Sequence, residues 1–160
     1  MQIYILRHGI AEDAAPGGSD AGRALTQEGK RKVRNVLERA RRAGVRPSMI
    51  VTSPLRRALE TAEIAAAVLG APSELVRTNA LLPSGSPDKV WKEIRARGAE
   101  EILLAGHEPL LSILTAYLLG CPALQVRMKK AALVAIEAAV EEMQPHGILQ
   151  WMLTPKLASE

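Results

Sequence analysis

Apolar residues follow two different periods along the chain, and the two periods alternate. Short, mostly apolar runs predict buried strands at residues 2–6, 48–52 and 101–105. Apolar positions that recur on one helical face predict helices at residues 27–43, 54–69, 87–97 and 110–118. Further strands are expected at residues 75–77, 131–138 and 147–153. This alternation predicts an α/β fold, a three-layer αβα sandwich with a mainly parallel central sheet.

Polar side chains follow each of the three clearest strands. Arg7 and His8 come directly after the first strand, and His107 follows the third. Burying such a group inside a strand without a partner costs on the order of 2–7 kcal/mol. We therefore expect the strands to end at these residues. Because the carboxyl ends of parallel strands line the ligand crevice of an open α/β sheet, these side chains are expected to meet at one edge.

The second strand passes into a helix with almost no loop. Ser53 is a good N-cap and Pro54 a good first helical residue, so the helix is expected to begin at this pair. A helix N-terminus binds anions through its free backbone N–H groups. Arg56 and Arg57 point about 100° apart on a helix, so at most one is expected to face the crevice, and spacing alone does not choose between them.

Composition narrows the class of protein. The chain has 160 residues, which indicates a single domain spanning 1–160, and no apolar run approaches the ~20 residues needed to cross a bilayer. Cys121 is the single cysteine, so no internal disulfide forms and a cytoplasmic location is the default expectation. One cysteine and three histidines also argue against a structural zinc site, and we expect no metal and no cofactor.

The net charge is +4, and much of the basic excess lies at residues 30–46. Such a segment attracts nucleic acid, but aromatic residues make up only 2% of the chain and Phe is absent, so a base-stacking surface is not expected. A solvated basic helix face is the simpler interpretation. A basic surface also suits an anionic substrate, including a phosphorylated partner.

The expected cluster of two guanidinium groups, two imidazoles and a helix N-terminus favours a phosphoryl group, because arginine binds phosphate oxygens with two hydrogen bonds and a fixed charge. Glycine-rich nucleotide-binding motifs are absent, which argues against a kinase or NTPase. His8 is the best candidate nucleophile, since neutral imidazole attacks phosphorus near pH 7 and would form a phosphohistidine that water hydrolyses.

Three motifs in order resemble those of the histidine phosphatase (phosphoglycerate-mutase-like) superfamily. They are residues 6–9, Leu-Arg-His-Gly; residues 52–62, beginning Thr-Ser-Pro-Leu; and Gly106-His107. The resemblance implies a phosphoglycerate-mutase-like fold, a phosphate-binding role for Arg57 rather than Arg56, and catalytic roles for Arg7, His8 and His107. The short chain and the Gly-His-Glu-Pro sequence at residues 106–109 are most similar to the SixA-type phosphohistidine phosphatases.

One departure from the superfamily pattern bears on the substrate. Larger members carry a glutamate proton donor where this chain has Leu-Leu-Pro-Ser-Gly at residues 81–85. An alkoxide leaving group needs that proton, whereas a protonated phosphohistidine ring leaves readily without it. Glu12, Asp13 and Glu108 are alternative donors, although each is expected to be an ordinary solvated acid.

The leading prediction is therefore a metal-independent phosphatase acting on phosphohistidine in a protein, such as a phosphorelay histidine domain. Arg7, Arg57 and His107 would hold the phosphoryl oxygens. A phosphatase of a small phosphorylated metabolite is the alternative enzyme. A non-catalytic phosphate-binding module is a second class, although binding alone needs no nucleophile. Nucleic-acid binding through residues 30–46 is a third and less favoured class, and neither a nucleic acid nor a membrane is expected as a partner.

Overall fold

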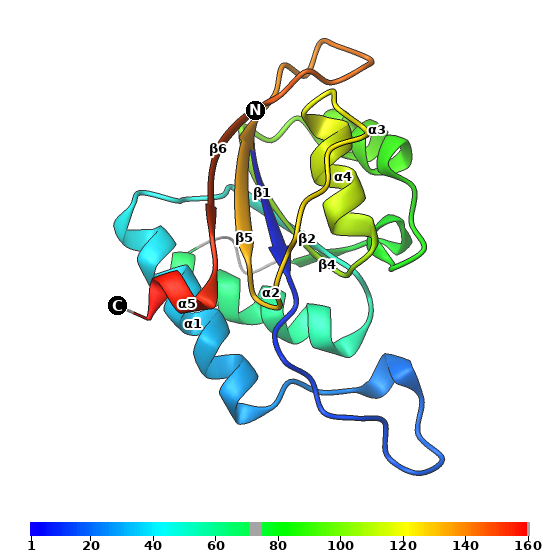
Figure 1. Ribbon diagram of the computed structural model, residues 1–160, viewed down its shortest axis with the longest axis vertical. Coiled ribbons are helices and arrows are strands. Elements are labelled where there is room, and N and C mark those ends of the chain that lie inside the picture. Colours follow the sequence, from blue (N-terminus) through cyan, green and yellow to red (C-terminus); the bar gives the residue numbers. More distant parts are fainter. Residues whose placement is uncertain (71–74, 160) are drawn as a thin grey trace.

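The computed structural model describes residues 1–70 and 75–159, which form a central sheet with helices on both faces (Figure 1). The strands are β1 (Gln2–Arg7), β2 (Met49–Thr52), β3 (Leu75–Arg77), β4 (Glu101–Gly106), β5 (Leu133–Glu137) and β6 (Ile148–Leu153). The α-helices are α1 (Gln27–Arg42), α2 (Arg56–Leu69), α3 (Pro87–Arg97), α4 (Leu110–Leu118) and α5 (Pro155–Ala158). Two 3₁₀ turns, η1 (Asp20–Gly22) and η2 (Asn79–Leu81), lie in the connections.

The six strands are ordered β3-β2-β4-β1-β5-β6. Pairing is parallel from β3 through β2 and β4 to β1, while β5 and β6 form an antiparallel hairpin at the β1 side. The predicted α/β sandwich with a mainly parallel sheet is therefore confirmed.

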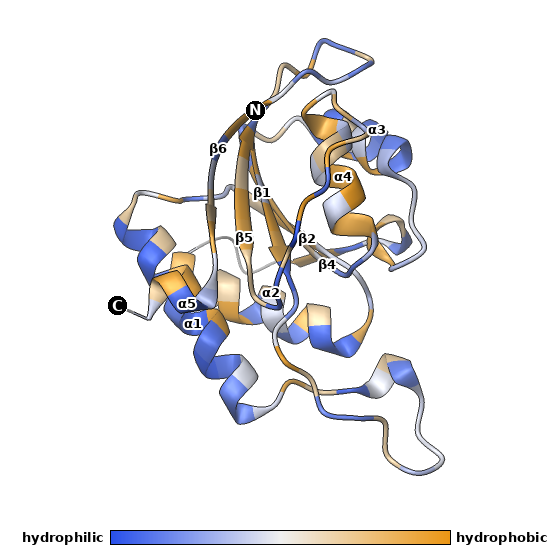
Figure 2. Ribbon diagram, viewed as in Figure 1, coloured by the Kyte–Doolittle hydropathy of each residue, from blue (hydrophilic) through white to orange (hydrophobic). Residues whose placement is uncertain are grey.

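Alternation along the strands divides the core between the two faces. Ile3, Ile5 and their neighbours on other strands pack with α3 and α4. Tyr4 and Leu6 point to the opposite face and pack with α1 and α2. Figure 2 shows the apolar residues gathered on the strands and the polar residues on the outer sides of the helices. Each fully buried Leu or Ile side chain contributes about 1.5–3 kcal/mol by leaving water.

Most predicted element boundaries agree with the structure, but the predicted start of the second helix is wrong. The α2 helix begins at Arg56, with Leu55 as its N-cap residue, rather than at Ser53 and Pro54. The Oγ atom of Ser53 accepts a hydrogen bond from the Leu55 N–H group at 3.2 Å, and the same hydroxyl lies 2.8 Å from Nε2 of His107. By contrast, α1 begins at Gln27 as predicted, and Thr26 caps it by accepting a hydrogen bond from the Gly29 N–H group at 2.9 Å.

Register brings the ends of the three parallel strands to one level. Arg7 lies opposite Gly106, and Thr52 lies opposite Ala105. The residues that directly follow β1, β2 and β4 are His8, Ser53 and His107. They therefore leave the sheet side by side at its carboxyl edge. Within the described part of the chain, every helix is too short or too polar to span a membrane.

Candidate active site

Four side chains meet at the carboxyl edge of the sheet, and we call Arg7, His8, Arg57 and His107 the tip cluster. The backbone N–H group of His8 donates to the Gly106 carbonyl at 3.0 Å, which continues the β1–β4 ladder by one residue. The rings of His8 and His107 lie 5.1 Å apart between centroids and are tilted by 51°. Although they are polar, His8 is only 6% exposed and His107 only 1%.

The tautomer of the neutral His8 ring follows from one hydrogen bond. Its Nδ1 atom lies 2.7 Å from the Gly9 carbonyl oxygen. A carbonyl oxygen only accepts, so Nδ1 carries the proton and donates it to this bond. The neutral ring then has its lone pair on Nε2, the nitrogen that faces away from this contact.

Gly9 fixes the turn that carries His8 because α1 approaches it closely. A Cβ atom at this position would lie 2.8 Å from Cγ2 of Val33 and 3.0 Å from the Gly29 carbonyl oxygen. The Gly9 N–H group donates to Oγ1 of Thr61 at 3.2 Å, and the Thr61 hydroxyl donates to the Arg57 carbonyl at 2.7 Å. The His8 turn is thereby joined directly to the first turns of α2.

The adjacent arginines of α2 differ completely in environment. The Arg57 side chain is 7% exposed, and its Nη1 atom lies 3.2 Å from Oδ2 of Asp20 and donates to the Asp20 carbonyl at 3.1 Å. Arg56 is 58% exposed and pairs with Glu60 at 3.4 Å. Of the two arginines that spacing left open, Arg57 is therefore the one that reaches the tip cluster.

Ser53 is the neighbour of His107 that sequence reasoning missed. Its Oγ atom and Nε2 of His107 are joined by a hydrogen bond of 2.8 Å, and both residues are buried. Ser53 lies in the motif at residues 52–62, but the pattern identified it only as a helix cap. The contact with His107 depends on strand register, which the residue types do not reveal.

Buried polar atoms without partners concentrate in the tip cluster. Within the described residues, five buried side-chain atoms lack a hydrogen-bond partner, and three of them are Nε of Arg7, Nε of Arg57 and Nδ1 of His107. Such atoms are rare in folded proteins and need an explanation. This concentration of nitrogen donors favours an anion as the ligand of the tip cluster.

Burial also keeps both imidazoles neutral. Burial is the main cause that lowers the pKa of His8 to about 4, with further lowering by the charges of Arg57, Arg7 and Lys130 against an opposing effect of the Gly9 hydrogen bond. Burial, followed by His8 and Arg57, lowers the pKa of His107 to about 3. At neutral pH the cluster thus combines two cationic guanidinium groups with two neutral rings.

The acidic side chains near the cluster have other contacts. Glu108 accepts a hydrogen bond from the Ser112 N–H group at 2.8 Å, and lines a cavity of about 580 Å³ together with Arg7. Glu12 and Asp13 are exposed on the loop after β1. Arg23, which follows η1 on the same loop, donates to the Glu12 carbonyl at 2.7 Å and to Asp20 at 3.2 Å.

The described residues contain no group of three or more histidine, cysteine, aspartate or glutamate side chains able to hold a metal ion. The guanidinium groups of Arg7 and Arg57 supply positive charge to the tip cluster. This arrangement suits a compact anion with several oxygen atoms.

Comparisons with known proteins agree with this geometry. The model of the histidine phosphatase superfamily (branch 1) matches residues 3–81. An uncharacterized protein of Picosynechococcus sp. is 34% identical over 151 residues, which cover 91% of this chain and 90% of that protein. The structure of the protein histidine phosphatase SixA complexed with tungstate is similar with a TM-score of 0.87 and 29% identity, covering 98% of both chains. A putative phosphohistidine phosphatase SixA from Agrobacterium tumefaciens shares the fold, with a TM-score of 0.81 and 21% identity over 96% of this chain and 97% of that chain.

Proposed function

The chain belongs to the histidine phosphatase superfamily (branch 1), and we propose that it hydrolyses phosphohistidine in a protein through a phosphorylated His8 intermediate. The observation that carries the proposal is the contact between Nδ1 of His8 and the Gly9 carbonyl oxygen. The Nδ1–H group of His8 is held by this carbonyl at 2.7 Å, which leaves Nε2 as a free nucleophile beside three unpartnered nitrogens of the tip cluster. Similarity to SixA at 29% identity supports the choice of substrate.

Arg7, Arg57 and His107 are proposed to hold the phosphoryl oxygens. Arg7 is anchored by a hydrogen bond from Nη1 to the Met128 carbonyl at 2.7 Å, so its guanidinium group is positioned before the ligand arrives. If the Ser53 hydroxyl donates to Nε2 of His107, then Nδ1 of His107 carries a proton and donates to an oxygen. Phosphoryl transfer requires mainly this positioning and charge neutralisation, so the proposed reaction needs no metal.

The proposed reaction has two displacements at phosphorus. In the first, Nε2 of His8 forms a bond to phosphorus while the bond between phosphorus and the substrate imidazole breaks, and that imidazole leaves as a neutral ring bearing its own proton. In the second, water attacks phosphorus and the bond to Nε2 breaks, so that the His8 ring returns to its neutral form and phosphate leaves as the monoanion that carries both protons of the water. The Gly9 carbonyl accepts the Nδ1–H bond throughout and stabilises the positive ring.

The leaving group distinguishes phosphohistidine from a phosphate ester. A substrate ring that already bears a proton leaves without an acid from the enzyme, whereas an alkoxide needs one. Residues 81–85 contribute no acid, and Glu12 and Asp13 are exposed on their loop. These features favour a phosphorus–nitrogen bond as the one that is broken.

A direct test compares two substrates in the presence of EDTA. Phosphate release is measured from a phosphohistidine peptide and from an aryl phosphate ester, with wild type and His8→Asn. We expect fast turnover of the peptide, slow turnover of the ester, and a loss of at least ~10³-fold for both in the variant, because the covalent path is removed. Retention of peptide turnover by His8→Asn would exclude the proposed intermediate. Phosphate binding without turnover of either substrate would favour a binding module.

One observation favours a second candidate, a phosphatase of a small phosphorylated metabolite. Glu108 lines the 580 Å³ cavity beside Arg7, where it is a candidate proton donor for an ester leaving group. Fast ester turnover that falls by ~10²-fold or more in Glu108→Gln, the range for loss of a general acid, would support this candidate. An unchanged ester rate would remove it.

A further inference from the structure

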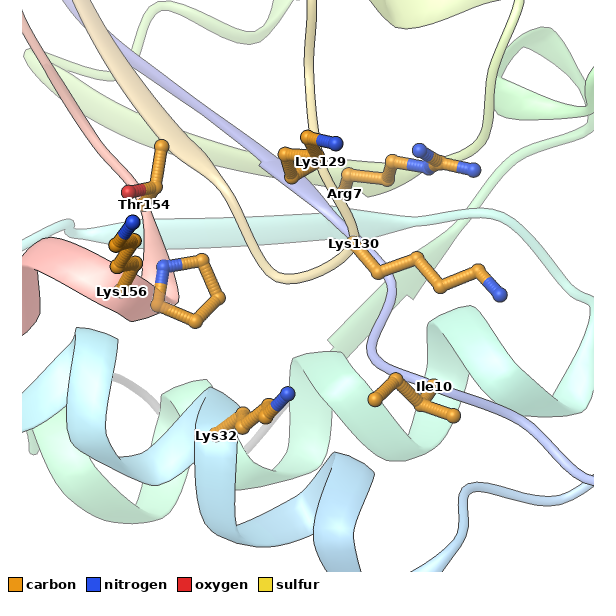
Figure 3. Close-up of a pocket in the computed structure, with 8 residues that line it drawn as sticks. Arg7, Ile10, Lys32, Lys129, Lys130, Thr154 and Lys156 are labelled. Carbon is orange, nitrogen blue, oxygen red and sulfur yellow. The ribbon is translucent and has the colours of Figure 1, made fainter. Parts of the chain in front are cut away.

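A second basic site adjoins the tip cluster on the other side of Arg7. A cavity of about 640 Å³, here called the lysine cavity, is lined by Arg7, Ile10, Lys32, Lys129, Lys130, Thr154, Pro155 and Lys156. Figure 3 shows the lysines arriving from three parts of the fold: Lys32 from α1, Lys129 and Lys130 from the turn before β5, and Lys156 from α5. Segments far apart in sequence thus converge beside the end of β1.

Positive charge dominates the lysine cavity. Among the residues that the structure describes, none that lines it is acidic. Lys32 pairs with Glu28 at 3.3 Å, but no hydrogen bond or ion pair within residues 1–70 and 75–159 involves the side chains of Lys129, Lys130 or Lys156. On α1, Lys30 pairs with Glu60 and Arg41 with Glu38. Three lysines of the lysine cavity therefore have no partner among the described residues and can contact an external anion.

The backbone fixes the lysine turn to the strand that carries the tip cluster. Ala131 has a φ of 64°, a left-handed conformation that residues with a side chain rarely adopt. In this conformation its N–H group lies 3.2 Å from the Arg7 carbonyl oxygen and 3.1 Å from that of His8, and donates to both. Lys130 is consequently close enough to His8 for its charge to contribute to the lowered pKa of that ring.

We propose that the lysine cavity binds acidic side chains of the protein substrate on one side of its phosphohistidine. The inference rests on the proposed function and adds a specificity site to it. The cavity shares Arg7 with the tip cluster, so a chain whose phosphorylated side chain reaches His8 would lie across it.

The chemistry of the lining favours carboxylates over a second phosphate. Lysine is a mobile point charge on a flexible stem, whereas a fixed phosphate site typically uses the planar, two-pronged guanidinium group of arginine. Three exposed ammonium groups can each follow a different carboxylate. Ile10 and Pro155 add apolar surface, which a polypeptide covers better than a small anion does.

The test uses two phosphohistidine peptides of equal length, one with Asp and Glu and one with Gln and Ser beside the phosphohistidine. The measured quantity is the ratio of kcat/KM for the acidic peptide to that for the neutral peptide. We expect Lys129→Gln/Lys156→Gln to lower this ratio by about 3- to 10-fold, the combined range for two exposed charge pairs. Lys130 is left intact because its charge acts on His8.

A matched control removes the same charge elsewhere. Lys89→Gln/Lys92→Gln changes two exposed lysines on α3, in the opposite helical layer, and is expected to keep the wild-type ratio. A ratio near one in wild type, or equal ratios in the two double variants, would overturn the inference while leaving the proposed function intact.

Binding of the unphosphorylated acidic peptide separates the inference from the proposed function. If neither phosphopeptide is hydrolysed, the proposed function fails, and the Kd of this peptide then tests the cavity. Weaker binding by Lys129→Gln/Lys156→Gln than by the control supports the site, and equal or absent binding overturns it. A small compound with two phosphate groups tests the alternative that the cavity binds a second phosphate. If Lys129→Gln/Lys156→Gln loses turnover of this compound but keeps its preference for the acidic peptide, the inference is overturned.

Discussion

The tip cluster and the lysine cavity share Arg7 and are both positive, yet they hold their charges in opposite ways. In the tip cluster, Arg57 is buried and bonded to a backbone carbonyl, and His8 is oriented by a second carbonyl. In the lysine cavity, Lys129, Lys130 and Lys156 are exposed. The tip cluster therefore has fixed charges that are shielded from water, and the lysine cavity has mobile charges in solvent.

The difference corresponds to two demands of a reaction on a macromolecule. The reacting phosphoryl group has one productive position, so groups that hold it gain from rigid placement. The substrate surface around the phosphoryl group only needs to be attracted and retained. Exposed charges do this by raising the association rate. We infer that substitutions in the tip cluster act mainly on turnover and those in the lysine cavity mainly on choice of substrate.

After loss of the His8 nucleophile, the largest expected effect comes from the adjacent arginines of α2. Arg57→Ala should lower kcat/KM by about 10²- to 10³-fold, as for loss of one preorganised donor to a transition state, while Arg56→Ala should change it less than about 3-fold. Steady-state kinetics on the phosphohistidine peptide measures both. Because Arg57 is buried, thermal unfolding of each variant accompanies the kinetics. Equal losses in two folded variants would contradict the assignment of Arg57 to the tip cluster.

Acid should affect the tip cluster through its buried histidines. In the folded state the pKa of His8 is lowered to about 4 and that of His107 to about 3. The unfolded chain, with histidine pKa values near ~6.5, binds more protons between these values, so acid favours unfolding. Stability is fully present above the unfolded pKa and is lost as pH falls toward 4.

The free energy of unfolding should therefore decrease by roughly 1–2 kcal/mol per histidine between pH 7 and pH 5. Urea unfolding at both pH values measures the change in wild type, His8→Asn and His107→Asn. Each variant should lose part of the pH dependence, since one buried titrating ring is removed. Identical pH dependence in all three proteins would show that the rings are not responsible.

The two regions also differ in how far the sequence could predict them. The strands, their order of appearance and the emergence of Arg7, His8 and His107 at strand ends follow from apolar periods and the cost of burying polar groups. The same local signals misplaced the start of α2, because Ser53 is favourable as a helix cap and its bond to His107 depends on the pairing of β2 with β4.

The lysine cavity lay outside what local patterns predict. Residues 30–46 form the basic segment of the sequence, but only Lys32 of that segment lines the cavity. The other lysines of the cavity come from the last third of the chain, namely Lys129, Lys130 and Lys156. Their convergence depends on the antiparallel placement of β5 and β6 beside β1 and on the left-handed turn at Ala131. Such long-range placement has no periodic signal in the sequence.

The smallest expected effect concerns Asp20, whose carboxylate partly neutralises the tip cluster, whereas no acid in the described part of the chain lines the lysine cavity. Asp20 Oδ2 lies 3.2 Å from Nη1 of Arg57, and the Asp20 side chain is 64% exposed. Arg23 and Arg57 hold the pKa of this carboxyl below its usual range, so it remains an anion near neutral pH. A phosphoryl group that binds Arg57 must compete with it.

Asp20→Asn should therefore strengthen inhibition by inorganic phosphate, and lower KM, by about 2- to 5-fold, the range for one exposed charge pair, with little change in kcat. The carbonyl contact from Asp20 to Arg57 at 3.1 Å does not depend on the side chain, so the loop should keep its position. Arg23→Gln is the matched control, because it removes the other partner of Asp20 and leaves the competing carboxylate beside Arg57. If Asp20→Asn instead lowers kcat by 10-fold or more, a loss typical of a missing proton donor, then Asp20 takes part in proton transfer and the tip cluster does not act without an acid.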